Sequence, residues 1–334
     1  MEIIVCTGDS HTCGQGADSI RTKYKPKNPN NIYNTAGKGI SRGGDLAHPC
    51  YVNLLRDMVA QATGSEYALT GGMAIRAQTR YPLVNAAVKL EGEYRLPKGW
   101  QLHTICLMET TKTAQLGIYV DGRLVRREAL HTPLPRYNEW SFRNICIRCE
   151  QDQQVTLKPV DGDVYISHIQ HDKGAYAVIN SGIGSCTTKR YMDEGFTYCV
   201  AEFDPAIVVA EAQTINDWIH YDSSETHETM LNRLLDHCKD NGAKLIYSTV
   251  APIRGAQESK KFGLLYEDFI AASKRVGQRD DLLFADSHAA FCEEISQIPQ
   301  EEQFDAFYVD NWHVNGRGHK LYADTIFAKL KEVL

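Results

Sequence analysis

The chain has 334 residues, of which 43% are hydrophobic and 23% charged, enough for the core of one large domain or two smaller ones. Its formal net charge of -6, without a cluster of lysine and arginine, disfavours nucleic acid as a partner. No apolar run reaches the roughly 18 residues of a membrane span, and the N-terminus lacks the pattern of a secretory signal. Ten scattered cysteines are typical of free thiols in a reducing compartment, so we expect a cytoplasmic protein.

Short apolar runs predict strands buried on both faces, and amphipathic patterns between them predict helices. The predicted strands are Ile3–Cys6, Tyr176–Ile179, Ile207–Ala210, Leu245–Val250 and the weaker Leu282–Ala285. The predicted helices are Tyr51–Ala62, Glu225–Lys239, Tyr266–Val276 and Gly318–Leu334, the last with Asn315 as its N-cap. This alternation predicts a doubly wound α/β fold with a parallel sheet.

Residues 71–171 break the alternation. This stretch contains many short alternating segments separated by turn signals, of which Asp121-Gly122 is a strong hairpin signal. We therefore predict an inserted β-sandwich domain at 71–171, and an α/β core formed by 1–70 and 172–334.

The first candidate for chemistry is Gly8-Asp9-Ser10-His11-Thr12, directly after the first predicted strand. Reactive groups collect at the carboxyl ends of strands in open α/β sheets, so Ser10 is a candidate nucleophile. Gly-Asp-Ser is also common turn chemistry, and by itself it is explained as a strand-ending turn.

A serine nucleophile needs a base, and that base needs an orienting carboxylate. Asp310 and His313 offer both in one short loop before the last predicted helix. The same spacing occurs at Asp45/His48 and at Asp217/His220, and a bare pair of this kind is more often a solvated loop. Position near the C-terminus, after Phe307-Tyr-Val309, distinguishes the Asp310/His313 pair.

Two further segments follow predicted strands and offer N–H donors. Asn216 lies after Ala206–Ala210, and the glycine-rich turn with Gly184 and Ser185 lies after Tyr176–Ile179. These donors, together with the N–H of Ser10, are candidates for an oxyanion hole. The alternatives are helix capping for Asn216 and a plain loop for the turn.

With these four elements in this order, the chain resembles the SGNH/GDSL hydrolases, whose blocks are Gly-Asp-Ser, a glycine after the second core strand, Gly-x-Asn-Asp and Asp-x-x-His. The match includes Thr12-Cys-Gly14-Gln-Gly16 and Asp310-x-x-His313-x-Asn315-x-x-Gly318-His319, and it covers the α/β core but not the insert. The resemblance implies a flavodoxin-like core and a serine esterase with Ser10, His313 and Asp310 as the catalytic triad. It further implies an oxyanion hole of Ser10, Gly184 or Ser185, and Asn216.

The chain departs from the family pattern in two blocks. Thr214 replaces the glycine before Asn216, and Ser185 occupies the position that we align with the family's oxyanion glycine. A backbone N–H survives such a replacement where the residue tolerates the local φ and ψ, so the donor is assigned to Gly184 or Ser185 without choosing between them.

Other motifs in the chain are weaker. Gly39-Ile-Ser41-Arg-Gly43 spells a nucleophile elbow, but a polar loop precedes it where a strand is required. Cys146 and Cys149 have the spacing of a metal or redox pair without a second pair, and a structural role is favoured. No metal or nucleotide motif is present, so we predict no cofactor.

The expected substrate is a small-molecule or oligosaccharide ester with a short acyl group, most simply an acetylated carbohydrate. Aromatic residues of the insert offer faces for a sugar or else pack its own core; they are Trp100, Tyr119, Tyr137 and Trp140. A lipid or thioester acyl hydrolase with the same triad and a non-catalytic glycan-binding module remain alternatives. A homo-oligomer formed through the insert is compatible with the sequence.

Overall fold

The computed structural model describes residues 1–14, 50–71, 80–81, 84–110, 112–131, 140–184, 186–253, 260–261 and 263–334. A five-stranded parallel sheet forms its centre. Its strands, in spatial order, are β12 (Tyr176–Asn180), β1 (Glu2–Thr7), β13 (Ile207–Glu211), β14 (Lys244–Ser248) and β17 (Leu282–Ala285). Numbered along the chain this order is 2-1-3-4-5, the flavodoxin-like order of doubly wound sheets. The predicted parallel α/β core is confirmed.

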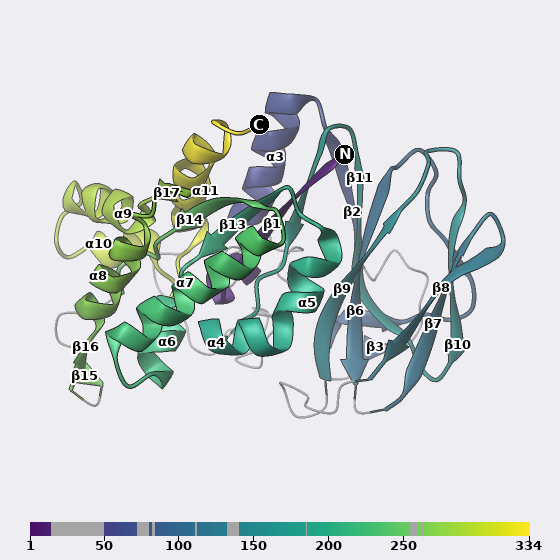
Figure 1. Ribbon diagram of the computed structural model, residues 1–334, viewed down its shortest axis with the longest axis horizontal. Coiled ribbons are helices and arrows are strands. Elements are labelled where there is room, and N and C mark those ends of the chain that lie inside the picture. Colours follow the sequence, from purple (N-terminus) through teal and green to yellow (C-terminus); the bar gives the residue numbers. More distant parts are fainter. Residues whose placement is uncertain are drawn as a thin grey trace.

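Helices cover both faces of this sheet because its strands are apolar on both faces. In β1, Ile3 and Val5 belong to one buried cluster, while Ile4 and Cys6 belong to another. Helices α6 (Thr214–His220), α7 (Ser224–Asp240) and α8 (Tyr266–Val276) pack against the first cluster, and α3 (Tyr51–Thr63), α9 (Ser287–Ser296) and α11 (Gly316–Leu330) pack against the second. Figure 1 shows α7 in front of the sheet, with α6 below it and α8 at the lower left.

Most of the predicted helices have their predicted bounds to within two residues, and α8 and β17 match them at both ends. α11 begins at Gly316 and ends at Leu330, so the predicted extension to Leu334 is wrong: residues 331–333 form a turn. The Asn315 side chain accepts hydrogen bonds from the N–H groups of Arg317 and Gly318, which confirms it as the N-cap. No helix of the described ranges combines the length and the apolar character that a bilayer crossing demands.

Two antiparallel sheets lie beside the core (Figure 1). One contains β3 (Arg80–Tyr81), β4 (Val84–Lys89), β11 (Tyr165–Lys173), β6 (Leu102–Thr110) and β9 (Trp140–Arg148), with β2 (Glu66–Gly71) also paired to β11. The other contains β5 (Tyr94–Arg95), β10 (Val155–Asp161), β7 (Ala114–Val120) and β8 (Arg123–Leu130). Further short elements are β15 (Lys260–Lys261), β16 (Leu264–Leu265), α1 (Ser10–Cys13), α4 (Thr188–Arg190), η3 (Tyr191–Gly195), α5 (Phe196–Cys199), η4 (Ala201–Phe203) and α10 (Gln303–Phe307).

One apolar cluster is shared by the two antiparallel sheets. Leu107 of β6 and Ile145 of β9 belong to it, as do Leu116 of β7 and Leu157 of β10. The hairpin predicted at Asp121-Gly122 joins β7 to β8, and both turn residues have positive φ, 47° and 79°, as a type I′ turn requires.

The six-stranded sheet meets the core next to the end of β12. The Asn144 side chain of β9 donates a 3.0 Å hydrogen bond to the carbonyl of Asn180, and the Asn180 side chain donates one of 2.8 Å to the carbonyl of Thr12. β2 pairs antiparallel with β11, with residues 66–71 opposite residues 173–168. Both strands therefore continue past the limits of the 71–171 segment into the adjoining residues of the chain.

Candidate active site

The turn that carries Ser10 is crowded, and glycine at position 8 makes it possible. A Cβ on Gly8 would lie 2.2 Å from Thr12 Oγ1 and 2.4 Å from Glu211 Oε2. Asp9 then caps the short helix α1 (Ser10–Cys13) by accepting a 3.0 Å hydrogen bond from the N–H of His11. Ser10 therefore stands at the first position of a helix at the carboxyl end of β1, with 7% of its surface exposed.

Ser10, His313 and Asp310, which we call the outer trio, form one chain of hydrogen bonds. Ser10 Oγ lies 3.0 Å from His313 Nε2, and His313 Nδ1 lies 2.8 Å from Asp310 Oδ2. A carboxylate accepts hydrogen bonds, so Nδ1 carries the proton and Nε2 is left to accept from the serine hydroxyl. The His313 and Asp310 side chains are 15% and 17% exposed, so solvent reaches the outer trio.

Local backbone bonds fix the loop of Asp310 and His313. Tyr308 pairs with Val314 in an isolated bridge, and the N–H of Val309 donates to the carbonyl of His313 at 2.9 Å. Asp310 Oδ1 accepts from the N–H groups of Trp312 and His313 at 2.8 and 2.7 Å. Burial opposes ionisation of Asp310, but the hydrogen bond and charge of His313 outweigh it and lower the pKa of this carboxyl.

Asn216 lies in the first turn of α6, 9% exposed. Its Nδ2 donates to Asp9 Oδ2 at 2.6 Å. An amide nitrogen has two hydrogens, so this bond holds the side chain beside Ser10 and leaves a second N–H for another acceptor. The capping alternative does not apply, because α6 has Gln213 as its N-cap and no side-chain cap bond.

The turn after β12 lies against the segment that carries Ser10. The N–H of Ile183 donates to the carbonyl of Gly8 at 2.9 Å, and a Cβ on Gly182 would lie 2.4 Å from the backbone nitrogen of Cys13. Gly184 follows, buried. Ser185 lies outside the described residues, as do Ser41, Asp45 and His48.

Asp217 is not paired with His220, the partner suggested by their spacing. Its Oδ2 lies 2.7 Å from Nδ1 of His227, whose Nε2 lies 2.8 Å from Ser273 Oγ. We call these three residues the inner trio. All three are fully buried. Asp217 also accepts from the N–H and the hydroxyl of Thr188, so the inner trio connects α6, α7, α8 and α4.

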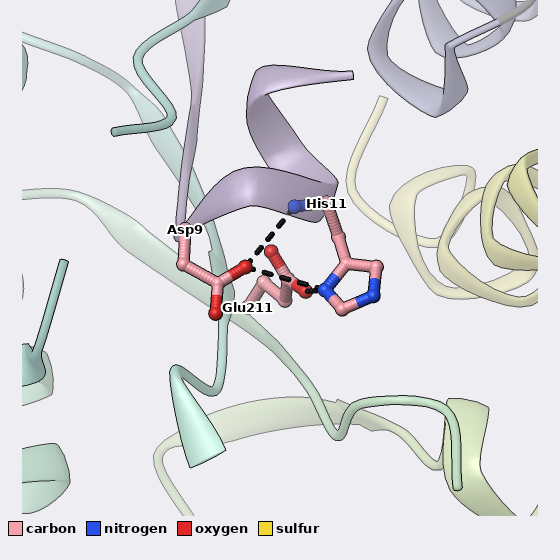
Figure 2. Close-up of side chains that lie close together, drawn as sticks. All are labelled: Asp9, His11 and Glu211. Carbon is pink, nitrogen blue, oxygen red and sulfur yellow. Dashed lines mark hydrogen bonds and ion pairs between the residues drawn. The ribbon is translucent and has the colours of Figure 1, made fainter. Parts of the chain in front are cut away.

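Sequence reasoning missed a second group beside Ser10: Asp9, His11 and Glu211 (Figure 2). His11 Nδ1 lies 3.2 Å from Asp9 Oδ1 and 3.3 Å from Glu211 Oε1, and all three side chains are buried. Glu211 also accepts hydrogen bonds from the N–H and the hydroxyl of Thr12. The signal available in the sequence was the ionisable residue on each side of Ser10.

The charges in this group depend on one another. Burial alone would lower the pKa of His11, but the hydrogen bonds and charges of Asp9 and Glu211 outweigh it and raise this pKa well above its usual range. Burial raises the pKa of the Asp9 carboxyl, and the hydrogen bond and charge of His11 outweigh it, so that pKa is lowered. Burial, and then the charge of Asp9, raises the pKa of Glu211.

Among the described residues, Asp9, His11 and Glu211 are the one group of three whose donor atoms lie close enough, within 4.8 Å, for a metal ion to bridge. Ion pairs between a protonated His11 and the two carboxylates account for the arrangement without an ion. All ten cysteines are free thiols. Cys146 Sγ lies 3.5 Å from the Glu202 carbonyl and Cys149 Sγ 3.4 Å from the Trp100 carbonyl.

Two of the four aromatic residues proposed for sugar contact are covered by lysine. Lys173 Nζ lies 5.5 Å from the ring centre of Trp100, and Lys158 Nζ lies 4.8 Å from that of Tyr119. Tyr137 lies outside the described residues, and Trp140 begins β9. The rings of Trp100 and Tyr119 are therefore each engaged by a lysine of the same chain.

No family model and no curated protein matches the chain. Among solved structures, a peptidoglycan O-acetylesterase superposes with a TM-score of 0.51 at 12% identity, covering 100% of this chain and 91% of its own. The chain has the SGNH/GDSL hydrolase fold. A GDSL-like lipase from Parabacteroides merdae superposes with a TM-score of 0.41 at 16% identity. An acetyl-xylooligosaccharide esterase from Geobacillus superposes with a TM-score of 0.40 at 21% identity. Each of these two comparisons covers 47% of this chain and 73% of the other.

Proposed function

We propose that the protein is a serine esterase that hydrolyses short acyl esters, with acetyl groups on a carbohydrate as the favoured substrate. The observation that carries the proposal is the continuous chain of hydrogen bonds from Ser10 Oγ through His313 to Asp310. It lies at the carboxyl end of β1, where His313 and Asp310 are partly exposed to solvent. This is the arrangement of nucleophile, base and orienting carboxylate that acyl transfer needs.

In the first half-reaction Ser10 Oγ attacks the ester carbonyl carbon while His313 Nε2 takes the hydroxyl proton. Asp310 holds Nδ1–H and stabilises the imidazolium that forms. The tetrahedral oxyanion is met by the N–H of Ser10, the N–H of Gly184 or Ser185, and the second amide hydrogen of Asn216. His313 then gives its proton to the leaving alcohol, which breaks the ester bond and leaves acyl-Ser10.

In the second half-reaction a water molecule attacks acyl-Ser10, and His313 again acts as the base. The carboxylic acid leaves as Ser10 recovers its proton. No step calls for a metal ion or a cofactor, because the positive charge on His313 and the N–H donors balance the developing negative charge.

Fold likeness supports the acetyl group and the carbohydrate. The peptidoglycan O-acetylesterase shares the fold over the full length of this chain, including the antiparallel region. We infer that residues 71–171 act as an inserted β-sandwich domain whose two sheets share one apolar cluster. In this proposal the insert helps to hold the glycan while the outer trio removes its acyl group.

The first test is Ser10→Ala, with Ser273→Ala as a control that removes the corresponding hydroxyl of the inner trio. We expect Ser10→Ala to lower kcat on p-nitrophenyl acetate by about 10⁶-fold, and Ser273→Ala to keep turnover at a reduced melting temperature. A fluorophosphonate should label Ser10 in the parent protein and nothing in Ser10→Ala. Unchanged turnover by Ser10→Ala would remove the assignment.

The acyl and alcohol parts are tested separately. Rates on acetate, octanoate and palmitate esters of p-nitrophenol should fall with chain length. Acetylated xylo- and peptidoglycan oligosaccharides should release acetate. A preference for long chains would favour the lipid or thioester hydrolase, and glycan binding without fluorophosphonate labelling would favour the non-catalytic module.

A further inference from the structure

His11 directly follows Ser10 on α1 and contacts three separate parts of the site. Its Nδ1 faces Asp9 Oδ1 at 3.2 Å and Glu211 Oε1 at 3.3 Å (Figure 2). Its Nε2 lies 2.9 Å from the backbone carbonyl of Trp312, in the loop that carries Asp310 and His313. One buried ring therefore lies between the nucleophile turn, the end of β13 and the loop of the base.

The partners of His11 determine its protons. A carbonyl oxygen only accepts, so Nε2 must carry a hydrogen that it donates to Trp312. Nδ1 faces an ionised Asp9 carboxylate, which also only accepts, so Nδ1 must carry a hydrogen as well. The ring is then an imidazolium, and the ionised Asp9 carboxylate balances its charge.

We propose that His11 is a positioning residue that holds the loop of Asp310 and His313 against the nucleophile helix through its bond to the Trp312 carbonyl. This inference rests on the proposed esterase function. In this role His11 acts through the residues that carry the reaction.

The loop side of this contact is well placed for such a role. The Trp312 carbonyl belongs to the peptide that joins Trp312 to His313, and the N–H of that peptide donates to Asp310 Oδ1 at 2.7 Å. His11 and Asp310 therefore hold one peptide from its two polar ends. Without His11 the carbonyl end is released, and His313 loses a restraint on the peptide that directly precedes its own Cα.

The nucleophile side is fixed by the same ring. Asp9 Oδ1 lies 3.2 Å from the His11 ring Nδ1 and also accepts from the His11 backbone N–H, while Oδ2 accepts from the Asn216 amide, so the ring and the amide hold the carboxylate between them. Because Asn216 keeps its second hydrogen for the oxyanion, a displaced Asp9 also displaces an oxyanion donor. His11 thus sets the relative position of the base and one oxyanion donor.

Other ionisable groups also surround the ring. His313 lies with its ring centre 5.7 Å from that of His11, and Tyr322 lies at 5.8 Å. Thr12 and Tyr51 bond to each other at 2.6 Å behind Glu211. None of these neighbours replaces the bond to Trp312, so substitution of His11 leaves that carbonyl without its ring donor.

The test compares His11→Ala and His11→Gln with His103→Gln, a matched control at another buried histidine, which lies on β6 in the antiparallel region. We expect His11→Ala to lower kcat by about 10²-fold, the cost of a misplacement of about 1 Å, with KM changed by less than about threefold. His11→Gln keeps an N–H donor without the charge and should lose less. His103→Gln should keep the parental kcat.

A spectroscopic measurement on the parent protein checks the proton assignment independently of turnover. In ¹⁵N-histidine-labelled protein at neutral pH, His11 should show both ring nitrogens protonated, and this signal should be missing from His11→Gln. A His11 ring without a proton on Nε2, or a parental kcat in folded His11→Ala and His11→Gln, would overturn the inference. An equal loss of kcat in His103→Gln would do the same. A parent protein without esterase activity would contradict the proposed function instead, and the ¹⁵N measurement would still decide the state of His11.

Discussion

The outer and inner trios have nearly the same hydrogen-bond geometry in different surroundings. The serine–histidine and histidine–aspartate distances are 3.0 and 2.8 Å in the outer trio, and 2.8 and 2.7 Å in the inner one. The outer histidine and aspartate are 15% and 17% exposed, whereas both inner ones are fully buried. The distances alone therefore do not distinguish a reactive serine from a structural one.

The two serines differ in the groups that surround their hydroxyls. The hydroxyl of Ser273 donates to the Phe269 carbonyl at 3.0 Å and lies 3.0 Å from Thr214 Oγ1, so its proton and its lone pairs are used inside the protein. Ser10 stands instead at the carboxyl end of a strand, at the start of a helix and beside the Asn216 amide. In the proposed mechanism, solvent access and nearby N–H donors, added to the trio, give the outer serine its chemistry.

The largest expected effect separates the two histidines. His313→Ala should lower kcat by about 10⁶-fold with little change in stability, because it removes the base of an exposed site. His227→Ala should keep kcat within about tenfold and lower the free energy of unfolding by about 3 to 5 kcal/mol, because it removes the ring that pairs with the buried Asp217 carboxylate. Kinetics and urea unfolding on the same samples measure both.

The comparison would break if folded His227→Ala lost turnover as completely as His313→Ala. The inner trio would then take part in the reaction, and burial would not be the feature that separates the two. Asp310→Asn gives an independent check, since it should cost about 10⁴-fold in kcat by favouring the wrong tautomer of the histidine.

Sequence reasoning placed the outer trio because its determinants are local. Ser10 follows a buried strand, and Asp310 and His313 are three residues apart in a loop before a capped helix. Such spacing is visible along the chain. The same reasoning predicted the five central strands, because each is a short apolar run; four of them are largely buried, and β17 at the edge is partly buried.

The inner trio and the His11 group depend on tertiary register, which no local pattern contains. Glu211 reaches His11 because β1 pairs with β13 in a register that places Thr7 opposite Ala210. Asp217 bonds to His227 on the next helix and not to His220, because the packing of α6 on α7 brings His227 close to it. The sequence did not predict α9, because only Ser287 and Phe291 of this helix are buried. Two such residues do not form a clear apolar stripe along the helix.

A smaller effect should separate two neighbouring residues of α6. Asn216 faces the outer trio and Asp217 belongs to the inner one. Asn216→Ala should lower kcat by about 10² to 10³-fold, the usual cost of one oxyanion donor, with KM nearly constant. Asp217→Asn should instead lower the melting temperature more than kcat, since it weakens the bonds from Thr188 and His227. An unchanged kcat in Asn216→Ala would remove that amide from the oxyanion hole.

The smallest effect concerns buried histidines that have no carboxylate, in contrast to those of both trios. His103 Nδ1 lies 2.7 Å from His171 Nδ1, and burial lowers the pKa of His103 to about 3 and that of His171 to about 4. Both are neutral in the folded protein, whereas unfolded histidine takes up a proton below a pKa of about 6.5. The unfolded state therefore binds more protons as the pH falls below that value, so stability must drop with falling pH down to about pH 4.

In His103→Gln this drop should be shallower by up to about 1.4 kcal/mol per pH unit, with kcat at neutral pH unaltered. Urea midpoints of both proteins between pH 7 and pH 4.5 measure it. Because the histidines outside this pair titrate alike in both proteins, equal slopes would mean that His103 is charged in the fold.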